Sequence, residues 1–186
     1  QLGPCVTFFP QPTTLVGSLD QDGNVNLMTA SWAGVVSKTP PTMAISLNKG
    51  RKSYENILAS GEFVVNMVPA SLAVEADFCG IRSGYHEDKS STCGFHFEPS
   101  EHVAVPLLAE SPLNLECRLV KELEIGDYRL LLGEMTGAVS GEVLGAIPQA
   151  GDTMGDSEAL AALSQWIDTL ALTLHSWRQP RPIAAW

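Results

Sequence analysis

The sequence predicts a mainly β domain with some α-helix, folded as a closed or partly closed antiparallel barrel. Segments rich in β-forming residues follow one another as hairpins, and an Asp-Gly pair at 22–23 separates the apolar segments 15–19 and 25–28. Such a pair between apolar segments is a strong hairpin signal. Helical segments do not alternate regularly with strands, as a doubly wound parallel fold would require. An antiparallel barrel accommodates hairpins of this kind.

The chain length suits one domain, or one domain with a helical appendage. Its 186 residues are 45% hydrophobic and 17% charged, which is enough apolar material for a packed core. We expect residues 1–150 to form the barrel domain. Residues 151–186 are expected to form a C-terminal helix that packs on the barrel or on a partner subunit.

In the first half of the chain, strands and turn residues define the expected elements. Gly61 is expected to end a helix as its C-cap, and Pro40 and Pro41 mark a turn or a sheet edge. Pro69 can open a short helix that runs to about Phe78. The other elements predicted here are strands at 15–19, 25–32, 42–47 and 63–68 and a helix at 51–60.

The second half predicts a long polar loop at 80–97, then a hairpin of strands at 115–125 and 128–135. A loop of that length in a compact domain is usually functional or disordered. The last helix has one apolar stripe at alternating spacings of three and four, which predicts burial. The stripe consists of Leu160, Leu163, Ile167, Leu170, Leu174 and Trp177.

Charge and motifs exclude several classes of function. The formal net charge is −10, which disfavours nucleic acids and anionic membranes as partners. No apolar segment is long enough to span a membrane, and the start at 1–4 lacks the features of an export signal, so we expect a cytoplasmic protein. The four cysteines lie far apart and are expected to be reduced, with no metal site. No nucleotide-loop or hydrolase motif occurs.

Three of the eleven basic residues fall within four positions. They are Lys49, Arg51 and Lys52, immediately before and at the start of the predicted helix. In an acidic protein this cluster is compatible with a site for a small anion, and equally with a solvated helix end. The pattern alone leaves both interpretations open.

Several segments, in this order, resemble the flavin reductase-like family, also called the FMN-binding split barrel, and most closely its flavoredoxin branch. The resemblance covers roughly residues 10 to 140, and the ordered set is more specific than any one segment. The segments are NLMTASW at 26–32, VSKTPP at 36–41, LNKGRKSYENI at 47–57, GEFVVN at 61–66, DFCG at 77–80, SG at 83–84, DK at 88–89 and GF at 94–95. The family implies an antiparallel, Greek-key-like split barrel with short flanking helices.

The resemblance implies non-covalent FMN, which requires a site for a phosphate dianion. A helix N-terminus offers free N–H groups and the positive end of a dipole. Arg51 and Lys52 would add charge there, and Ser53 would add a hydroxyl donor. The preceding residues Ser46, Leu47 and Asn48 are also expected to border the cofactor.

In the family, the strand that resembles Thr29-Ala30-Ser31-Trp32 follows the edge of the isoalloxazine ring. Asn26 is expected on the ribityl or ring side, and Trp32 is expected to form a wall of the ring slot. The alternative for Trp32 is a core tryptophan. For Asn26 the alternative is a hairpin residue that satisfies the turn backbone.

Lys89 is expected to approach the flavin, where a cation stabilises the reduced ring. Its alternative is a solvated loop lysine paired with Asp88. The segment Phe78-Cys79-Gly80 is expected near the phosphate or the ring, with Cys79 as a small buried residue. Tyr128 would face the open side of the flavin from the partner subunit. We therefore expect Lys89, Trp32 and Tyr128 to be the catalytic residues.

Three functions follow from this resemblance. In the first, an enzyme takes electrons from NAD(P)H or a protein donor through FMN to a free flavin, an iron centre or a redox partner protein. In the second, a non-catalytic flavin carrier exchanges electrons only with a partner. In the third, an interaction domain has lost its flavin. The family also implies a homodimer.

Overall fold

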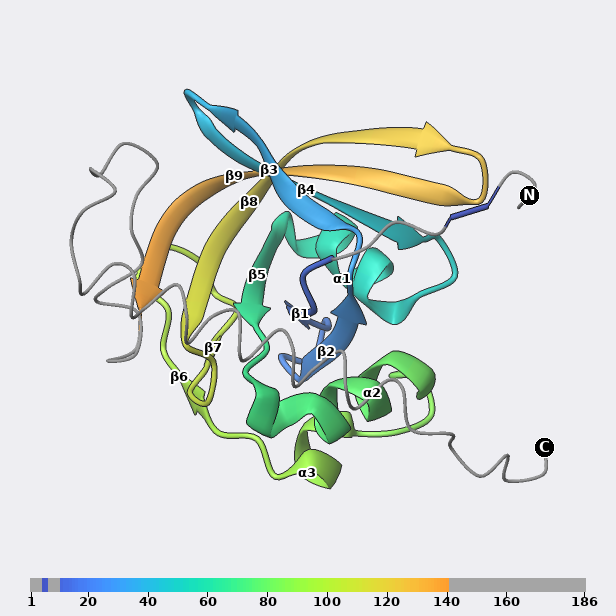
Figure 1. The fold of residues 1–186 in the computed structure, drawn as a ribbon, viewed down its shortest axis with the longest axis vertical. Coiled ribbons are helices and arrows are strands. Elements are labelled where there is room, and N and C mark those ends of the chain that lie inside the picture. The colour runs from blue at the N-terminus through green and yellow to red at the C-terminus, as the bar shows by residue number, and fades with distance from the viewer. Residues whose placement is uncertain (1–4, 7–10, 141–186) are drawn as a thin grey trace.

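The computed structural model describes residues 5–6 and 11–140 of the chain. The C-terminal helix expected at 151–186, with its apolar stripe, lies outside the described residues. Figure 1 shows a strongly curved sheet, with three helices on the side of its first two strands. None of the helices in the described ranges has the length and apolarity needed to cross a membrane.

Nine strands, three α-helices and one 3-10 turn make up the described chain. In chain order they are β1 (Thr14–Leu19), β2 (Val25–Ala30), β3 (Ala33–Lys38), β4 (Pro41–Asn48), α1 (Lys52–Ser60), β5 (Glu62–Met67), η1 (Ala70–Leu72), α2 (Ala73–Ile81), α3 (Lys89–Cys93), β6 (Phe97–Glu98), β7 (Leu107–Leu108), β8 (Leu113–Ile125) and β9 (Tyr128–Ser140).

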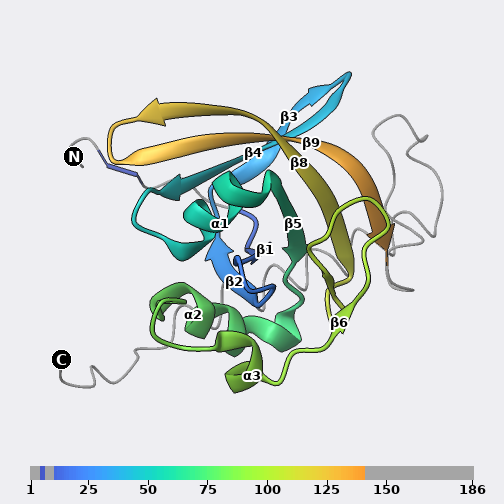
Figure 2. The same cartoon turned by 180° about the vertical axis from the view of Figure 1, so that it is seen from behind.

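Seven of the strands form one sheet in the order β2-β1-β5-β8-β9-β4-β3, and every pairing is antiparallel. The antiparallel architecture is therefore confirmed. β2 and β3 lie at opposite edges of the sheet, yet only Ser31 and Trp32 separate them in the chain. Because two residues cannot bridge a flat sheet of this width, the sheet must curl until its edges meet. Figures 1 and 2 show this curvature from both sides.

The structure corrects three predicted boundaries. The strand predicted at 25–32 ends at Ala30, and a second strand, β3, follows after Trp32. The helix predicted from Pro69 to Phe78 is a 3-10 turn followed by α2, which continues to Ile81. The loop predicted at 80–97 contains α3, because the Asp88 carboxylate caps it by accepting the N–H groups of Ser90 and Ser91.

The main core lies inside the curved sheet and under α1. Val16, Ile45, Phe63, Cys117 and Leu131 are each fully buried in it. Helix α1 ends at Gly61 as predicted, where φ is 72° and the Gly61 N–H donates to Ile57 O at 2.8 Å. The left-handed conformation favours glycine at this position. The cap fixes the point at which α1 turns back into β5.

A buried carboxylate anchors the loop before β7. Glu116 on β8 is fully buried, and its oxygens accept the backbone N–H groups of Glu101 at 3.3 Å, His102 at 2.6 Å and Val103 at 3.2 Å. Hydrogen bonds of this kind offset the desolvation of a buried charge. The loop is therefore held through its backbone.

Candidate functional site

The start of α1 offers unsatisfied donors. Among the described residues, the backbone N–H groups of Lys52 and Ser53 have no acceptor, while those of Arg51 and Tyr54 are bonded to Asn48 O and Arg51 O. The N-cap residue Arg51 makes no side-chain cap. Free amides at a helix N-terminus attract anions through direct hydrogen bonds and through the helix dipole.

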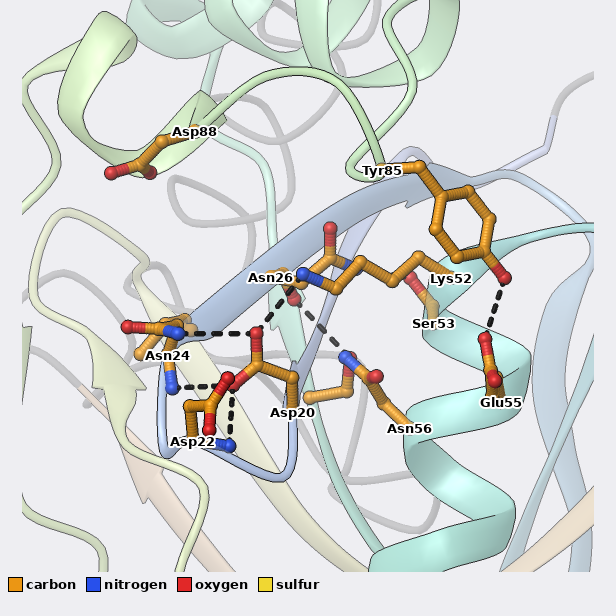
Figure 3. A network of polar contacts seen from close by, with 12 residues as sticks. Asp20, Asp22, Asn24, Asn26, Lys52, Ser53, Glu55, Asn56, Tyr85 and Asp88 are labelled. Carbon is orange, nitrogen blue, oxygen red and sulfur yellow. Dashed lines mark hydrogen bonds and ion pairs between the residues drawn. The ribbon is translucent and has the colours of Figure 1, made fainter.

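A buried hydrogen bond holds Ser53 at this helix start. The Asn26 Nδ2 atom on β2 donates to Ser53 Oγ at 2.7 Å, and both side chains are buried. Because Ser53 Oγ accepts this bond, its own proton remains available to a ligand. The alternative role of Asn26 as a turn residue is wrong, since its side chain binds α1. Figure 3 shows Asn26, Ser53 and Lys52 close together where β2 meets the start of α1.

The backbone at Gly84 packs closely against Asn26 and Lys52. A Cβ atom at Gly84 would lie 1.9 Å from Asn26 Oδ1 and 3.4 Å from Lys52 Cδ. Only a residue without a side chain fits this approach without displacing Asn26. Its neighbour Tyr85 donates its hydroxyl to Glu55 Oε2 at 2.7 Å, which ties the segment after α2 to α1 (Figure 3).

The Lys52 side chain forms an ion pair with Asp20. Its Nζ atom donates to Asp20 Oδ2 at 3.0 Å, in the β1–β2 turn. The Asn24 backbone N–H and then the Lys52 ammonium hold the pKa of the Asp20 carboxyl at about 2. Lys52 therefore has an anionic partner within the chain. Arg51, in contrast, is exposed, and its side chain forms no hydrogen bond or ion pair with the other described residues.

Lys89 is a buried cation. It is 4% exposed, and its Nζ atom donates to Cys79 O at 3.1 Å and to Arg82 O at 3.3 Å. Burial lowers the pKa of Lys89, and the nearby Arg51 guanidinium lowers it further. The alternative of a solvated lysine paired with Asp88 is wrong. Two donors of the ammonium are used, so one remains for a ligand.

The end of α2 places the segment Phe78-Cys79-Gly80 against β2. Thr29 Oγ1 donates to Ala76 O, and a Cβ atom at Gly80 would lie 3.4 Å from Thr29 Cβ. Cys79 is 1% exposed, which confirms it as a small buried residue. Burial raises the pKa of its thiol to about 12.

Two residues after the end of β2, Trp32 forms an aromatic pair with Tyr128. Ser31 and Trp32 are exposed after Ala30, and the Trp32 ring lies 5.0 Å from the Tyr128 ring at 45°. Because Trp32 is 36% exposed, the alternative of a core tryptophan is wrong. Tyr128 contacts Trp32 of its own chain, and its role toward the flavin of a partner subunit stays a prediction.

The three residues expected before α1 have mainly structural contacts. Ser46 donates its backbone N–H to Trp32 O at 2.9 Å, and Asn48 Oδ1 accepts the Gly50 N–H at 2.9 Å. The Leu47 side chain is 1% exposed and belongs to the core. A ligand could therefore reach Leu47 only through its backbone.

A hollow of about 370 Å³, which Lys52 helps to line, lies between α1 and the β1–β2 turn. Its rim includes Asp20, Asp22 and Glu55. This acidic rim disfavours a phosphate. The anion-attracting groups are the backbone start of α1, Arg51 and Lys89, and not the lining of this hollow.

Sequence reasoning missed Asp20, Glu55 and Tyr85. Each acts through a partner on another element, and no local pattern predicts such a pair. Gly84 belongs to the segment that carries the resemblance, but its contact with Asn26 becomes evident only in the structure.

A family model, the flavin reductase like domain, matches residues 6–147 of the chain. The chain belongs to this family. Membership confirms the resemblance drawn from the ordered segments.

Solved structures agree with this assignment. Flavoredoxin of Desulfovibrio vulgaris (Miyazaki F) is 34% identical, with a TM-score of 0.72 over 76% of each chain. A flavoredoxin from Methanosarcina acetivorans is also 34% identical, with a TM-score of 0.71 over 76% of this chain and 75% of that one. A split-barrel domain protein from Shewanella frigidimarina shares the fold at 24% identity and a TM-score of 0.69, covering 76% of this chain and 71% of that one. The split-barrel prediction is confirmed.

Relatives in sequence span a similar region. A protein of Archaeoglobus fulgidus is 34% identical over 117 residues, which are 63% of this chain and 66% of the relative. A flavin reductase (NADH) of Kitasatospora aureofaciens is 29% identical over 126 residues, 67% of this chain and 63% of that protein. The chain therefore spans slightly less than two thirds of the length of these relatives.

Proposed function

We propose that this chain binds FMN non-covalently and acts as a flavin reductase-like oxidoreductase, with NAD(P)H or a protein as electron donor. The observation that carries the proposal is a pair of interacting cations, Arg51 at the start of α1 and Lys89 at the start of α3. Arg51 and Lys89 come from different elements, repel each other, and have no ion-pair partner among the described residues. Like charges held together this way are stabilised by a bound anion.

The donor set fits a phosphate. The amides of Lys52 and Ser53, the Ser53 hydroxyl and the Arg51 guanidinium would donate to its oxygens. The buried Asn26 bond keeps Ser53 in place, so little ordering is needed when the ligand binds. FMN carries one terminal phosphate of this kind.

The ring would extend from this helix start along the free edge of β2. In the proposed arrangement Trp32 forms a wall of the ring slot, Tyr128 lies at its outer side, and Lys89 supplies positive charge. When bound, FMN supplies the two-electron and one-electron chemistry of its ring. The chain binds and orients the cofactor, and its aromatic pair excludes water.

An absorbance titration tests this proposal. We expect FMN to bind more tightly than riboflavin, which lacks the phosphate, because the charged contacts are lost. Arg51→Ala should weaken FMN binding by about 1–3 kcal/mol, the cost of a lost charged hydrogen bond. Lys38→Ala, an exposed cation on β3, is the matched control and should change nothing. Equal affinities for FMN and riboflavin would refute the phosphate site.

Reduction of the bound FMN separates the enzyme from the carrier. We expect NADH or NADPH to bleach the flavin band in anaerobic solution, since the relative from Kitasatospora aureofaciens is a flavin reductase (NADH). Reversible bleaching by dithionite, with no response to either nucleotide, would indicate an electron carrier instead.

We further propose that two copies of the chain associate through the exposed apolar side chains of β3 and β8. Val35 is 64% exposed, Val36 58% and Ile125 57%, which is unusual for a sheet surface left to water. Light scattering at several protein concentrations would report the dimer. A monomer at all of them would refute it.

A further inference from the structure

Two thiols from different helices pack into the same apolar cluster, one at each end of the segment that carries Gly84 and Lys89. Cys79 belongs to α2, and Cys93 is the last residue of α3. Both side chains pack into the cluster formed by Leu15, Leu27 and Leu108, and the neighbouring Cys93 thiol adds to the rise in the pKa of Cys79 that burial causes. Cys117 lies in the main core inside the curved sheet, apart from this cluster. Both thiols of the pair are free.

The chain between the two thiols carries two residues of the candidate site, Gly84 and Lys89. Gly84 closes over Asn26 within this segment, and Lys89 lies at the start of α3. The Lys89 ammonium also bonds to the Cys79 carbonyl at 3.1 Å. A covalent link between Cys79 and Cys93 would therefore close this segment into a ring at its base.

We propose that Cys79 and Cys93 are a redox-active dithiol, which a low-molecular-weight disulfide oxidises to a disulfide that joins α2 to α3. Cys93 is half-buried, so the oxidant can reach its sulfur, whereas Cys79 is 1% exposed. Cys93 is accordingly the first thiol to react, and Cys79 resolves the mixed disulfide.

The exchange balances without any other reactant. The Cys93 thiolate attacks one sulfur of the small disulfide, forms a mixed disulfide and releases one small thiolate. The Cys79 thiolate then attacks Cys93 Sγ and releases the second. Two electrons pass from the cysteine pair to the small disulfide, and the two protons lost by the cysteines are taken up by the released thiolates.

Burial sets the rate of this exchange. It raises the pKa of both thiols, that of Cys79 to about 12. The Lys89 ammonium lowers both pKa values, Glu75 raises both, and Glu87 raises that of Cys93. Since only the thiolate attacks, oxidation should accelerate by about tenfold per pH unit between pH 7 and 9.

The test uses the full chain without added flavin. Protein with Cys5→Ser, which removes an exposed thiol, is equilibrated with reduced and oxidised glutathione, quenched in acid, alkylated and digested. We expect a loss of two hydrogen masses and a peptide in which Cys79 is joined to Cys93. Hydrogen exchange of residues 80–92 should slow in the oxidised form and recover on reduction.

Variants and controls decide the outcome. Cys93→Ser should prevent both the link and the change in hydrogen exchange, and Cys93→Ala provides a second variant in case the serine is poorly tolerated. Cys117 should stay reduced throughout. A stable glutathione adduct on Cys93 without an internal link, or a link that leaves hydrogen exchange unchanged, would overturn the proposal. Neither readout involves flavin, so failure here is separate from failure of FMN binding.

Discussion

The two ends of the candidate site are built in opposite ways. The helix end consists of Asn26, Arg51, Ser53, Gly84 and Lys89. Its Asn26, Ser53 and Lys89 side chains are buried, Arg51 is exposed, and the parts fit closely, with Asn26 bonded to Ser53 at 2.7 Å and Gly84 against Asn26. The aromatic end consists of Trp32 and Tyr128, which touch each other at the rim, with Trp32 36% exposed. A site with one fixed end and one open end holds a constant group while it admits different reaction partners.

Substitution of Gly84 should affect the helix end most. In Gly84→Ala the new Cβ atom would meet Asn26 Oδ1 at 1.9 Å, so Asn26 must leave Ser53. We expect a loss of about 2–3 kcal/mol in the free energy of unfolding, as for an overpacked interior, and a matching loss of FMN affinity. Urea denaturation and an FMN titration measure the two effects.

The matched control is Gly34→Ala, on β3, where an added Cβ meets nothing within 4 Å. It should leave both quantities unchanged. Equal behaviour of the two alanine variants would mean that the helix end is not closely fitted.

Removal of the Asn26 side chain should have a somewhat smaller effect. Asn26→Ala deletes a buried hydrogen bond to Ser53 without forcing a clash, so we expect a loss of about 1–2 kcal/mol in unfolding free energy. Tyr85→Phe deletes the more exposed bond to Glu55 and should cost less. If the tyrosine variant lost more stability, the Tyr85–Glu55 hydrogen bond would matter more than the buried Asn26–Ser53 bond.

The pH dependence of FMN binding should identify Lys89 as part of the helix end. Burial lowers the pKa of Lys89, so this side chain loses its proton below its ordinary pKa of 10.5. A bound phosphate favours the charged form, and FMN affinity should therefore fall as the pH rises through the lowered pKa. Lys89→Met should bind FMN weakly, with little change over the same range. A wild-type affinity constant from pH 7 to 10 would contradict this role.

The aromatic end should respond least to substitution. Trp32→Phe keeps an aromatic ring beside Tyr128 at a partly exposed position, so we expect less than about 1 kcal/mol of lost stability. FMN affinity should change little, because the phosphate contacts remain. The rate with different electron acceptors should change more, as measured by steady-state assays. A large loss of FMN affinity would show that both ends are equally closely fitted.

Sequence and structure agree best where the determinants are local. Helix α1 was predicted at 51–60 with Gly61 as its C-cap, a local signal, and the structure places it at Lys52–Ser60 with that cap. The break between β2 and β3 was missed because Ser31 and Trp32 carry no glycine or proline turn signal. It arises from closure of the whole sheet.

Pairs that join distant elements could not be predicted. Lys52 was expected to face a phosphate, but Asp20, which lies 32 positions earlier, binds it. Lys89 was expected near the flavin, yet its carbonyl partners depend on how α2 ends. Such contacts depend on tertiary packing.

The buried Glu116 carboxylate has a practical consequence for protein engineering. It holds the surface loop at 101–103 through main-chain amides, and the Glu101 side chain is 81% exposed, whereas the His102 ring lies against Gly137. An anchor that ignores side-chain identity leaves position 101 open to replacement. A fluorophore label or an affinity peptide could therefore be attached there, because the Glu116 carboxylate holds the backbone of the loop in place.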